Sequence, residues 1–133
     1  MKKLTVVVFE MEGALARMST ALADANVNLL DIDVKGTESI GVAIITVSDE
    51  EFETAHEALR ESGHQVMPQE VLLVKLEDKP GGLAQLAVKL ADAKVNVRSM
   101  RIVKREDDYC LAAIVPEPVD IARAVLIDVV VAG

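Results

Sequence analysis

The sequence of 133 residues contains an internal repeat at an offset of 68 positions. The segments Leu22–Ala25 and Leu90–Ala93 both read Leu-Ala-Asp-Ala, and each is followed, after one intervening residue, by Val-Asn. Further identities occur across the same offset without a gap: Leu4 with Leu72, Val6 with Val74, Gly13 with Gly81, Leu15 with Leu83, and Ala16 with Ala84. Because self-similarity at a fixed offset constrains a fold more than any single motif does, the chain is predicted to contain two copies of one unit.

Each copy is predicted to contain strand, helix, strand, strand, helix and strand, in that order. In the first copy, hydrophobic periodicity predicts strands over 4–9, 29–35, 41–47 and 66–67, a helix over 14–25, and a second helix that begins at a capping box, 48–51. Two right-handed strand–helix–strand connections interleave these strands into one antiparallel sheet with both helices on one face. The predicted fold is α+β, with two ferredoxin-like βαββαβ domains in tandem, over 1–69 and 70–133.

Burial patterns and chain breaks refine this prediction. The segment 29–35 alternates, so Leu30 and its alternate neighbours are predicted to face the core of a half-buried strand, whereas 41–47 is apolar on both faces and belongs inside the sheet. Asn26 and Gly63 are predicted to end the two helices. In the second copy, strands are predicted over 97–103 and 109–115, around a charged turn at 104–108. Its second helix is short, and 127–131 must supply a last strand that is truncated, displaced or exchanged with another chain.

Composition excludes several classes of function. The net charge is −8 and no basic run occurs, which argues against nucleic acid and anionic membranes as partners. Only three residues are aromatic, too few for a platform that stacks bases. The single cysteine, Cys110, excludes an internal disulfide and a cysteine-rich metal site, and is predicted to be buried. No signal peptide and no membrane-spanning run of about 18 apolar residues occur, so a cytoplasmic location is expected.

No catalytic constellation is visible in the sequence. His56 and His64 are interpreted as solvated surface residues, and the carboxylates of Asp31 and Asp33 as the polar face of a strand. The acidic cluster 106–108 is interpreted as a hairpin tip and not as a calcium loop. No metalloprotease, nucleophile-elbow or phosphate-loop spacing occurs. We therefore expect no enzymatic activity, no catalytic residue, no metal and no cofactor.

The segment 78–83, Asp-Lys-Pro-Gly-Gly-Leu, is the strongest local signal for a binding site. It joins a predicted strand to a predicted helix. Its glycines, Gly81 and Gly82, permit positive φ angles and close approach to the backbone. The helix that follows opens with free N–H groups, which attract an anion such as a carboxylate. The alternative interpretation is a tight strand-to-helix turn with no ligand.

This segment, together with the helix end at 90–93 and the Val-Asn-Val run at 95–97, resembles the signature of the ACT domain family. The whole chain resembles two ACT domains in tandem. The resemblance implies the same βαββαβ fold and a regulatory module that binds a small ligand, usually an amino acid, at an interface between paired domains. It also implies a homodimer.

The resemblance also implies which residues contact the ligand. In the second copy these are Asp78, Gly81, Gly82 and Leu83, with Asn96 and Val97 facing them from a neighbouring domain. N–H groups at Gly82 and Leu83 would bind the ligand carboxylate, and Asp78 or Asn96 would bind its ammonium group. The corresponding residues of the first copy are Glu12, Gly13, Ala14, Leu15, Asn28 and Leu29. Because a glutamate replaces the proline there, the second copy is expected to hold the better site.

Arg98 departs from the repeat, because it occupies the position of the apolar Leu30. One interpretation is a guanidinium that binds the ligand carboxylate. The other is a residue at the end of a strand whose apolar stem reaches across to solvent. The sequence therefore predicts a non-catalytic amino-acid sensor that acts on a partner, for which a biosynthetic enzyme is one candidate. The alternative is a regulatory subunit or assembly module of such an enzyme, without a ligand of its own.

Overall fold

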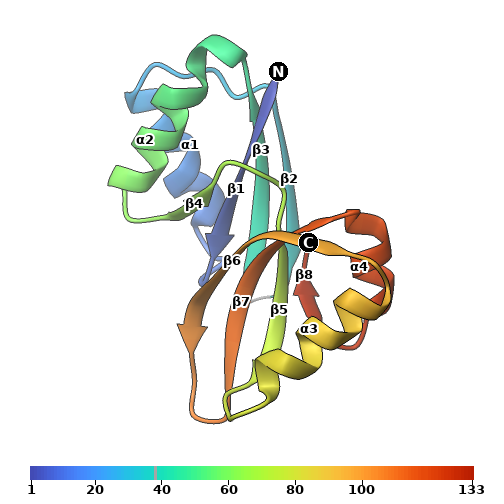
Figure 1. Ribbon diagram of the computed structural model, residues 1–133. Helices are drawn as coiled ribbons and strands as arrows, with labels where there is room; N and C mark the ends of the chain where they lie inside the picture. Colours follow the sequence, from blue (N-terminus) through green and yellow to red (C-terminus); the bar gives the residue numbers. More distant parts are fainter. Residues whose placement is uncertain (38) are drawn as a thin grey trace. The chain divides into compact units, whose positions relative to one another are not determined.

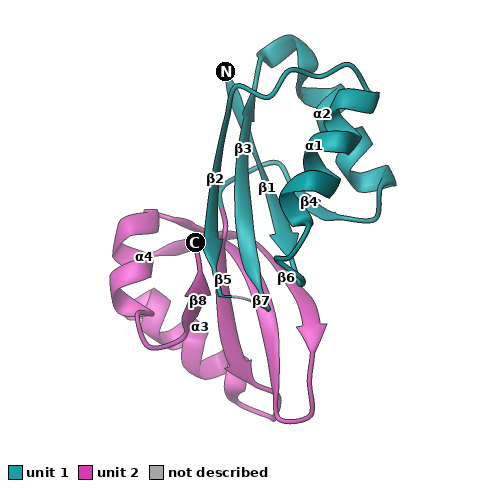
Figure 2. Ribbon diagram, turned by 180° about the vertical axis from the view of Figure 1, so that it is seen from behind, with its two compact units in different colours: residues 1–70 teal, residues 71–133 magenta. Residues whose placement is uncertain are grey.

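Figure 1 shows the protein as a computed structural model, which describes residues 1–37 and 39–133. The chain divides into two compact units, Met1–Glu70 and Val71–Gly133 (Figure 2). Each unit contains one four-stranded antiparallel sheet and two α-helices, so the α+β fold predicted from the sequence is confirmed. The predicted boundary between two ACT-like domains, 1–69 and 70–133, stays a prediction.

The first unit has the strand order β2-β3-β1-β4 in its sheet, as expected of a ferredoxin-like unit. Glu38, in the turn expected at 36–39, lies outside the described residues. The elements of this unit are β1 (Lys2–Val8), α1 (Ala14–Asp24), β2 (Asp31–Gly36), β3 (Gly41–Val47), a short 3-10 helix η1 (Asp49–Glu51), α2 (Phe52–Glu61) and β4 (Gln65–Met67).

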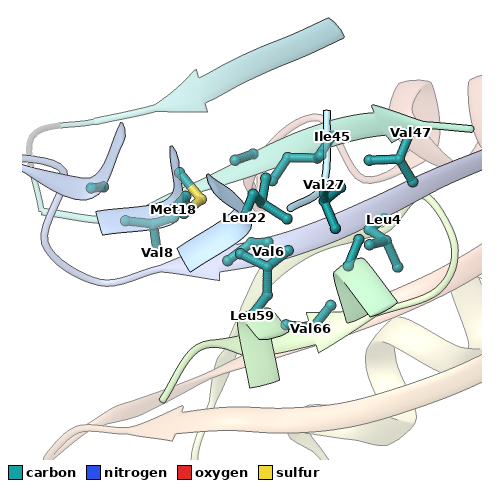
Figure 3. Close-up of a cluster of buried hydrophobic side chains, with 13 residues drawn as sticks. Leu4, Val6, Val8, Met18, Leu22, Val27, Ile45, Val47, Leu59 and Val66 are labelled. Atoms are coloured by element: carbon teal, nitrogen blue, oxygen red, sulfur yellow. The ribbon is translucent and has the colours of Figure 1, made fainter. Parts of the chain in front are cut away.

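The core of the first unit lies between its sheet and the two helices (Figure 3). Helix α1 buries Ala14, Met18 and Leu22, a spacing of four residues that keeps one face on the sheet. Strand β3 is buried along its length and pairs with both β1 and β2, which confirms the predicted interior strand. Strand β2 lies at the sheet edge and is mostly exposed, so the predicted half-buried strand is wrong at Leu30, just before β2, and at Val34, which are 46% and 42% exposed.

Matching helix ends mark the repeat. Asn26 adopts a left-handed conformation with φ 60°, as predicted, and Val27 N–H donates to the Leu22 carbonyl at 2.9 Å. In the second unit Lys94 has the same φ, and Val95 N–H donates to the Leu90 carbonyl at 2.9 Å. Each helix thus ends in the same hydrogen-bonded turn, which directs the chain back into the sheet.

The predicted capping box at 48–51 is wrong in its hydrogen bonds. Ser48 makes no side-chain bond to the helix, and η1 occupies the position expected for the first turn of α2. The Glu51 carboxylate instead accepts a hydrogen bond from the Asn28 backbone N–H at 2.8 Å. A charge-assisted bond to that N–H replaces the bond that the carboxylate would make within a capping box.

The second unit repeats this arrangement with the strand order β6-β7-β5-β8. Strand β8 pairs with β5 of the same unit, so no strand from another chain is needed to complete this sheet. Cys110 is buried in the core of the unit, as predicted. The elements are β5 (Leu72–Glu77), α3 (Gly82–Asp92), β6 (Asn96–Arg105), β7 (Tyr109–Glu117), a short α4 (Val119–Val125) and β8 (Val130–Ala132). No helix within the described ranges is long and apolar enough to cross a membrane.

Candidate functional site

The turn between β5 and α3 depends on both of its glycines. Gly81 caps the helix in a left-handed conformation, with φ 89°. Gly82 is buried, and a Cβ atom there would lie 2.1 Å from the Glu77 carbonyl oxygen. The Gly82 N–H donates to the Lys79 carbonyl at 3.0 Å, so it closes the turn and is not free for a ligand, contrary to expectation. Within residues 1–37 and 39–133 no backbone acceptor pairs with the N–H of Leu83 or Ala84, which leaves two donors at this helix end.

Asp78, at the start of this turn, forms an ion pair that the sequence analysis did not predict. Arg105 Nη1, from the end of β6, lies 2.7 and 2.8 Å from the two carboxylate oxygens of Asp78. The hydrogen bond to Asp78 raises the pKa of Arg105 above its usual value. The Asp78 N–H also donates to the Asp108 carbonyl at 3.1 Å, which ties the turn to the hairpin. The only sequence signal for this partner was the charge cluster of the turn 104–108.

The predicted ligand residues Asn96 and Val97 lie at the opposite end of the same sheet. Asn96 pairs with Glu117 on β7, whereas Glu77, which precedes the turn, pairs with Tyr109. The strand rise of about 3.3 Å per residue places these two ends of β7 roughly 26 Å apart. The second unit alone therefore does not bring Asn96 to Gly81.

Arg98 lies in a β-bulge on β6, where the pairing with β7 shifts between Val97 and Ser99. Its guanidinium Nε donates to the Glu117 carboxylate, and both side chains are largely exposed. The equivalent position in the first copy is Leu30, which is also exposed, so the prediction that this position faces the core is wrong. Leu30 immediately precedes β2 and Arg98 lies near the start of β6, and both strands are at the edges of their sheets.

The corresponding turn in the first unit is held by different contacts. Gly13 has a φ of 75° and caps α1, and the Ala14 N–H donates to the Met11 carbonyl at 3.1 Å. Arg17 donates through Nη1 to the Glu12 carbonyl at 3.0 Å and through Nη2 to the Glu10 carbonyl at 2.9 Å. The Arg17 side chain therefore already binds two carbonyl oxygens of this turn, those of Glu10 and Glu12.

The other residues predicted for the first site do not gather around Gly13. Leu15 is 55% exposed on α1, and Leu29 is partly buried against the core. Asn28 precedes the end of β2 that pairs with Thr46 on β3. The opposite end of β2, at Gly36, is the end that lies near Val8, from which the chain leads into the Gly13 turn. Its N–H is bound by Glu51, so the first unit offers fewer free groups than the second.

A shallow groove of about 530 Å³ runs from the Gly81 turn along α3. Leu83 and Val88, on this helix, are 49% and 58% exposed. The walls of the groove are mostly apolar and Lys89 supplies a positive charge; the lining residues are Gly81, Ala84, Gln85, Val88 and Lys89. Such a surface fits the aliphatic part of a small ligand whose carboxylate binds the helix N-terminus.

The two histidines differ in their surroundings. The ring of His56 stacks on Phe52 with centroids 6.5 Å apart. Both rings are partly buried, and His64 Nδ1 lies 2.9 Å from Ser62 Oγ, so neither histidine is fully solvated. In the part of the chain that the structure describes, no three His, Cys, Asp or Glu side chains form a group that suits a metal ion.

The titration of His64 predicts a pH dependence of stability. Burial lowers its pKa below the usual 6.5, and the charge of Arg17 lowers it further. The unfolded state therefore binds the proton more tightly, so the contribution of His64 to stability is present above about pH 6.5 and is lost as the pH falls. Urea denaturation between about pH 7.5 and pH 5.5 should show a loss of stability that is smaller in His64→Gln. His56→Gln is the control, and an equal loss in all three proteins would contradict the prediction.

Comparison with known proteins places the second unit in a family. Residues 71–125 match the model of the ACT domain. None of the curated proteins matches the chain. Among solved structures, the chain is 24% identical to protein BT0572 from Bacteroides thetaiotaomicron, with 97% of this chain and 89% of that chain covered and a TM-score of 0.47.

Two further similar structures have known descriptions. The ACT domain of prephenate dehydrogenase from Bacillus anthracis is 26% identical over 49% of this chain and 99% of that chain, with a TM-score of 0.46. The regulatory subunit of aspartate kinase from Thermus thermophilus is 18% identical over 93% of this chain and 87% of that chain, with a TM-score of 0.44. The ACT domain is a regulatory, ligand-binding domain. The second unit therefore contains a segment that matches the ACT domain, and the first unit has the same order of strands and helices.

Proposed function

We propose that the protein is a non-catalytic sensor that binds an amino acid at the Gly81 turn of a homodimer. The observation that carries this proposal is the open N-terminus of α3, which lies beside an apolar groove within the segment that matches the ACT domain. The output is a change in a partner, for which a biosynthetic enzyme in the cytoplasm is the natural candidate.

The groups at the turn suit the two charges of an α-amino acid. The free N–H groups of Leu83 and Ala84 bind the α-carboxylate, with the partial positive charge of the helix N-terminus. The Asp78 carboxylate has about four acceptor positions, so it binds the ammonium group while it keeps Arg105. The ligand side chain then lies against Val88 in the groove.

The homodimer is needed because Asn96 lies at the far end of the sheet. A two-fold axis that sets β6 of one chain beside the Gly81 turn of the other creates two equal sites. Each site combines the turn of one chain with Asn96 and Val97 of the other chain. The Asn96 side chain supplies both a donor and an acceptor to the ligand. Val97, which is 37% exposed, supplies apolar contact.

A thermal-shift screen against the common amino acids tests the proposal. A ligand at 100 times its Kd stabilises the folded protein by about 2.7 kcal/mol, so at least one amino acid should raise the Tm by several degrees. Leu83→Asp should abolish this shift, because its carboxylate repels that of the ligand, while the helix N-terminus tolerates the new charge. Leu15→Asp, at the matching and equally exposed position of the first copy, is the control. No shift with any amino acid, or equal loss in both variants, would disprove the proposal.

A second candidate function is an assembly module or regulatory subunit without its own ligand. The closed Gly82 N–H and the Asp78–Arg105 pair favour it, since both reduce the number of free groups at the turn. In that case a biosynthetic enzyme should co-purify with the protein from its native host, and Leu83→Asp should leave both this association and the Tm with amino acids unchanged.

A further inference from the structure

We propose that the first unit holds a second, separate pocket, which binds a small monocarboxylic acid that also carries a hydroxyl or ammonium group. The pocket has a volume of about 470 Å³ and lies where the end of β1, α1 and the link from α2 to β4 meet. Its walls are Val7–Glu10, Arg17 and Ser62–Gln65. None of the residues predicted for the first turn, such as Gly13 or Asn28, lines it, and the inference does not depend on the amino-acid site at Gly81.

Arg17 is positioned in this pocket before any ligand arrives. Its Nη1 and Nη2 atoms donate to the carbonyls of Glu12 and Glu10, which uses two of the five N–H donors of the guanidinium. The other three make no hydrogen bond within the described residues. An arginine whose orientation is fixed in this way loses little entropy when it binds a carboxylate through its remaining donors.

The hydrogen bonds around His64 fix which nitrogen carries the proton. The Ser62 hydroxyl donates its single proton to the Leu59 carbonyl at 2.8 Å. Ser62 Oγ must therefore accept the bond from His64 Nδ1, 2.9 Å away, so Nδ1 carries the proton of the neutral ring. This leaves Nε2 with a lone pair that accepts a hydrogen bond. Burial and the nearby Arg17 charge lower the pKa of His64, which favours the neutral form of the ring.

These two groups determine the class of ligand. The Arg17 donors bind one carboxylate, and the neutral Nε2 of His64 requires a hydroxyl or ammonium donor. Glu10 also lines the pocket, and its negative charge disfavours a second carboxylate in the ligand. Val7, Val8 and Phe9 supply an apolar wall. A small 2-hydroxy or 2-amino acid meets all four conditions.

The second unit lacks this pocket although it shares the fold. Across the offset of 68 residues, Gln85 occupies the position of Arg17 and Lys75 that of Val7. The cavity at the corresponding place measures only about 130 Å³ and is lined in part by Lys75, Gln85 and Leu126. The repeat thus supplies a natural substitution, Arg17→Gln, which gives the first unit the residue of the second.

The experiment uses L-lactate and acetate as probes and follows the two histidine rings of the full chain by NMR, with His56→Gln to assign the signals. L-Lactate should shift the His64 ring signals and leave those of His56 unchanged. Arg17→Gln should weaken binding about tenfold or more, as expected for the loss of a charged hydrogen bond. His64→Gln should weaken lactate binding more than acetate binding, since acetate has no hydroxyl to donate.

Arg17→Gln also removes two bonds to backbone carbonyls, so Arg17→Lys is included as a variant that keeps the charge; it should bind with intermediate affinity. Leu83→Asp should leave lactate binding unchanged, which separates this site from the one at Gly81. The inference is overturned if L-lactate leaves the His64 signals unaffected, if Arg17→Gln in its folded state binds as well as the wild type, or if Leu83→Asp abolishes lactate binding.

Discussion

Gly82→Ala should destabilise the second unit by about 3 kcal/mol, the upper part of the range for an overpacked buried site. The added Cβ atom would lie 2.1 Å from the Glu77 carbonyl oxygen, a distance at which the backbone itself must move. Glu77 is paired with Tyr109 across the sheet, so it has little freedom to withdraw. The turn can relieve the overlap only by breaking the bond from the Gly82 N–H to the Lys79 carbonyl or by unwinding the start of α3.

Gly81→Ala is the matched control, because it changes the neighbouring residue in the same turn. No atom lies within 4 Å of a Cβ placed on Gly81. Its cost is therefore only that of the left-handed conformation, about 1–2 kcal/mol. The two variants separate steric overlap from backbone conformation.

Cys110 provides the measurement, because it is the single cysteine and is buried in the second unit. Its reaction with an aromatic disulfide reagent requires that the unit open, so the labelling rate reports the stability of that unit alone. A loss of about 3 kcal/mol corresponds to a labelling rate roughly a hundredfold faster than that of the wild type. A rate for Gly82→Ala no higher than for Gly81→Ala would show that the close contact with Glu77 is easily relieved.

The fold was predictable from sequence because apolar residues recur in both copies with the same spacing. The two glycine turns were predictable because glycine adopts left-handed conformations without steric cost. The bulges of β6 were not, because an extra residue in a strand reverses the alternation on which the prediction rests, and the sequence does not mark it. Arg98 lies in one such bulge, and so its orientation could not be derived.

Contacts between distant segments were the part of the candidate site that sequence reasoning missed. Arg105 lies 27 positions from Asp78, and their pairing depends on the register of β6 against β7. The pocket around His64 depends on a short hydrogen-bonded link after α2, where Ser62 and Arg17 come together from separate elements. Neither arrangement has a local motif, because each is fixed by packing and not by spacing along the chain.

A mixture of two inactive variants should recover ligand binding. In the proposed homodimer, each site combines the turn of one chain with Asn96 of the other. Leu83→Asp blocks the turn and Asn96→Ala removes the amide, so each variant alone should bind the ligand found in the thermal-shift screen at least about tenfold more weakly. Both positions are exposed, and neither substitution removes a core contact.

Heterodimers of the two variants contain one intact site and one doubly altered site. The intact site pairs Leu83 of the Asn96→Ala chain with Asn96 of the Leu83→Asp chain. Random pairing makes half of the dimers heterodimers, so about a quarter of all sites should bind with the affinity of the wild type. Different affinity tags on the two chains allow the heterodimer to be isolated, in which case about half of its sites should bind.

Isothermal titration calorimetry of the isolated heterodimer gives the stoichiometry directly. A chain that carries both substitutions, paired with the wild type, is the control. In contrast to the heterodimer of single variants, this pair should retain no fully intact site, because each of its two sites lacks either Leu83 or Asn96. Binding with wild-type affinity in that control would show that Asn96 and the Gly81 turn belong to a site within one chain. No binding in the heterodimer of single variants would contradict a site shared between two chains. The expected pair of results follows only if a second chain brings its Asn96 to the turn, since the two ends of β7 that adjoin Asn96 and the turn within one unit lie roughly 26 Å apart.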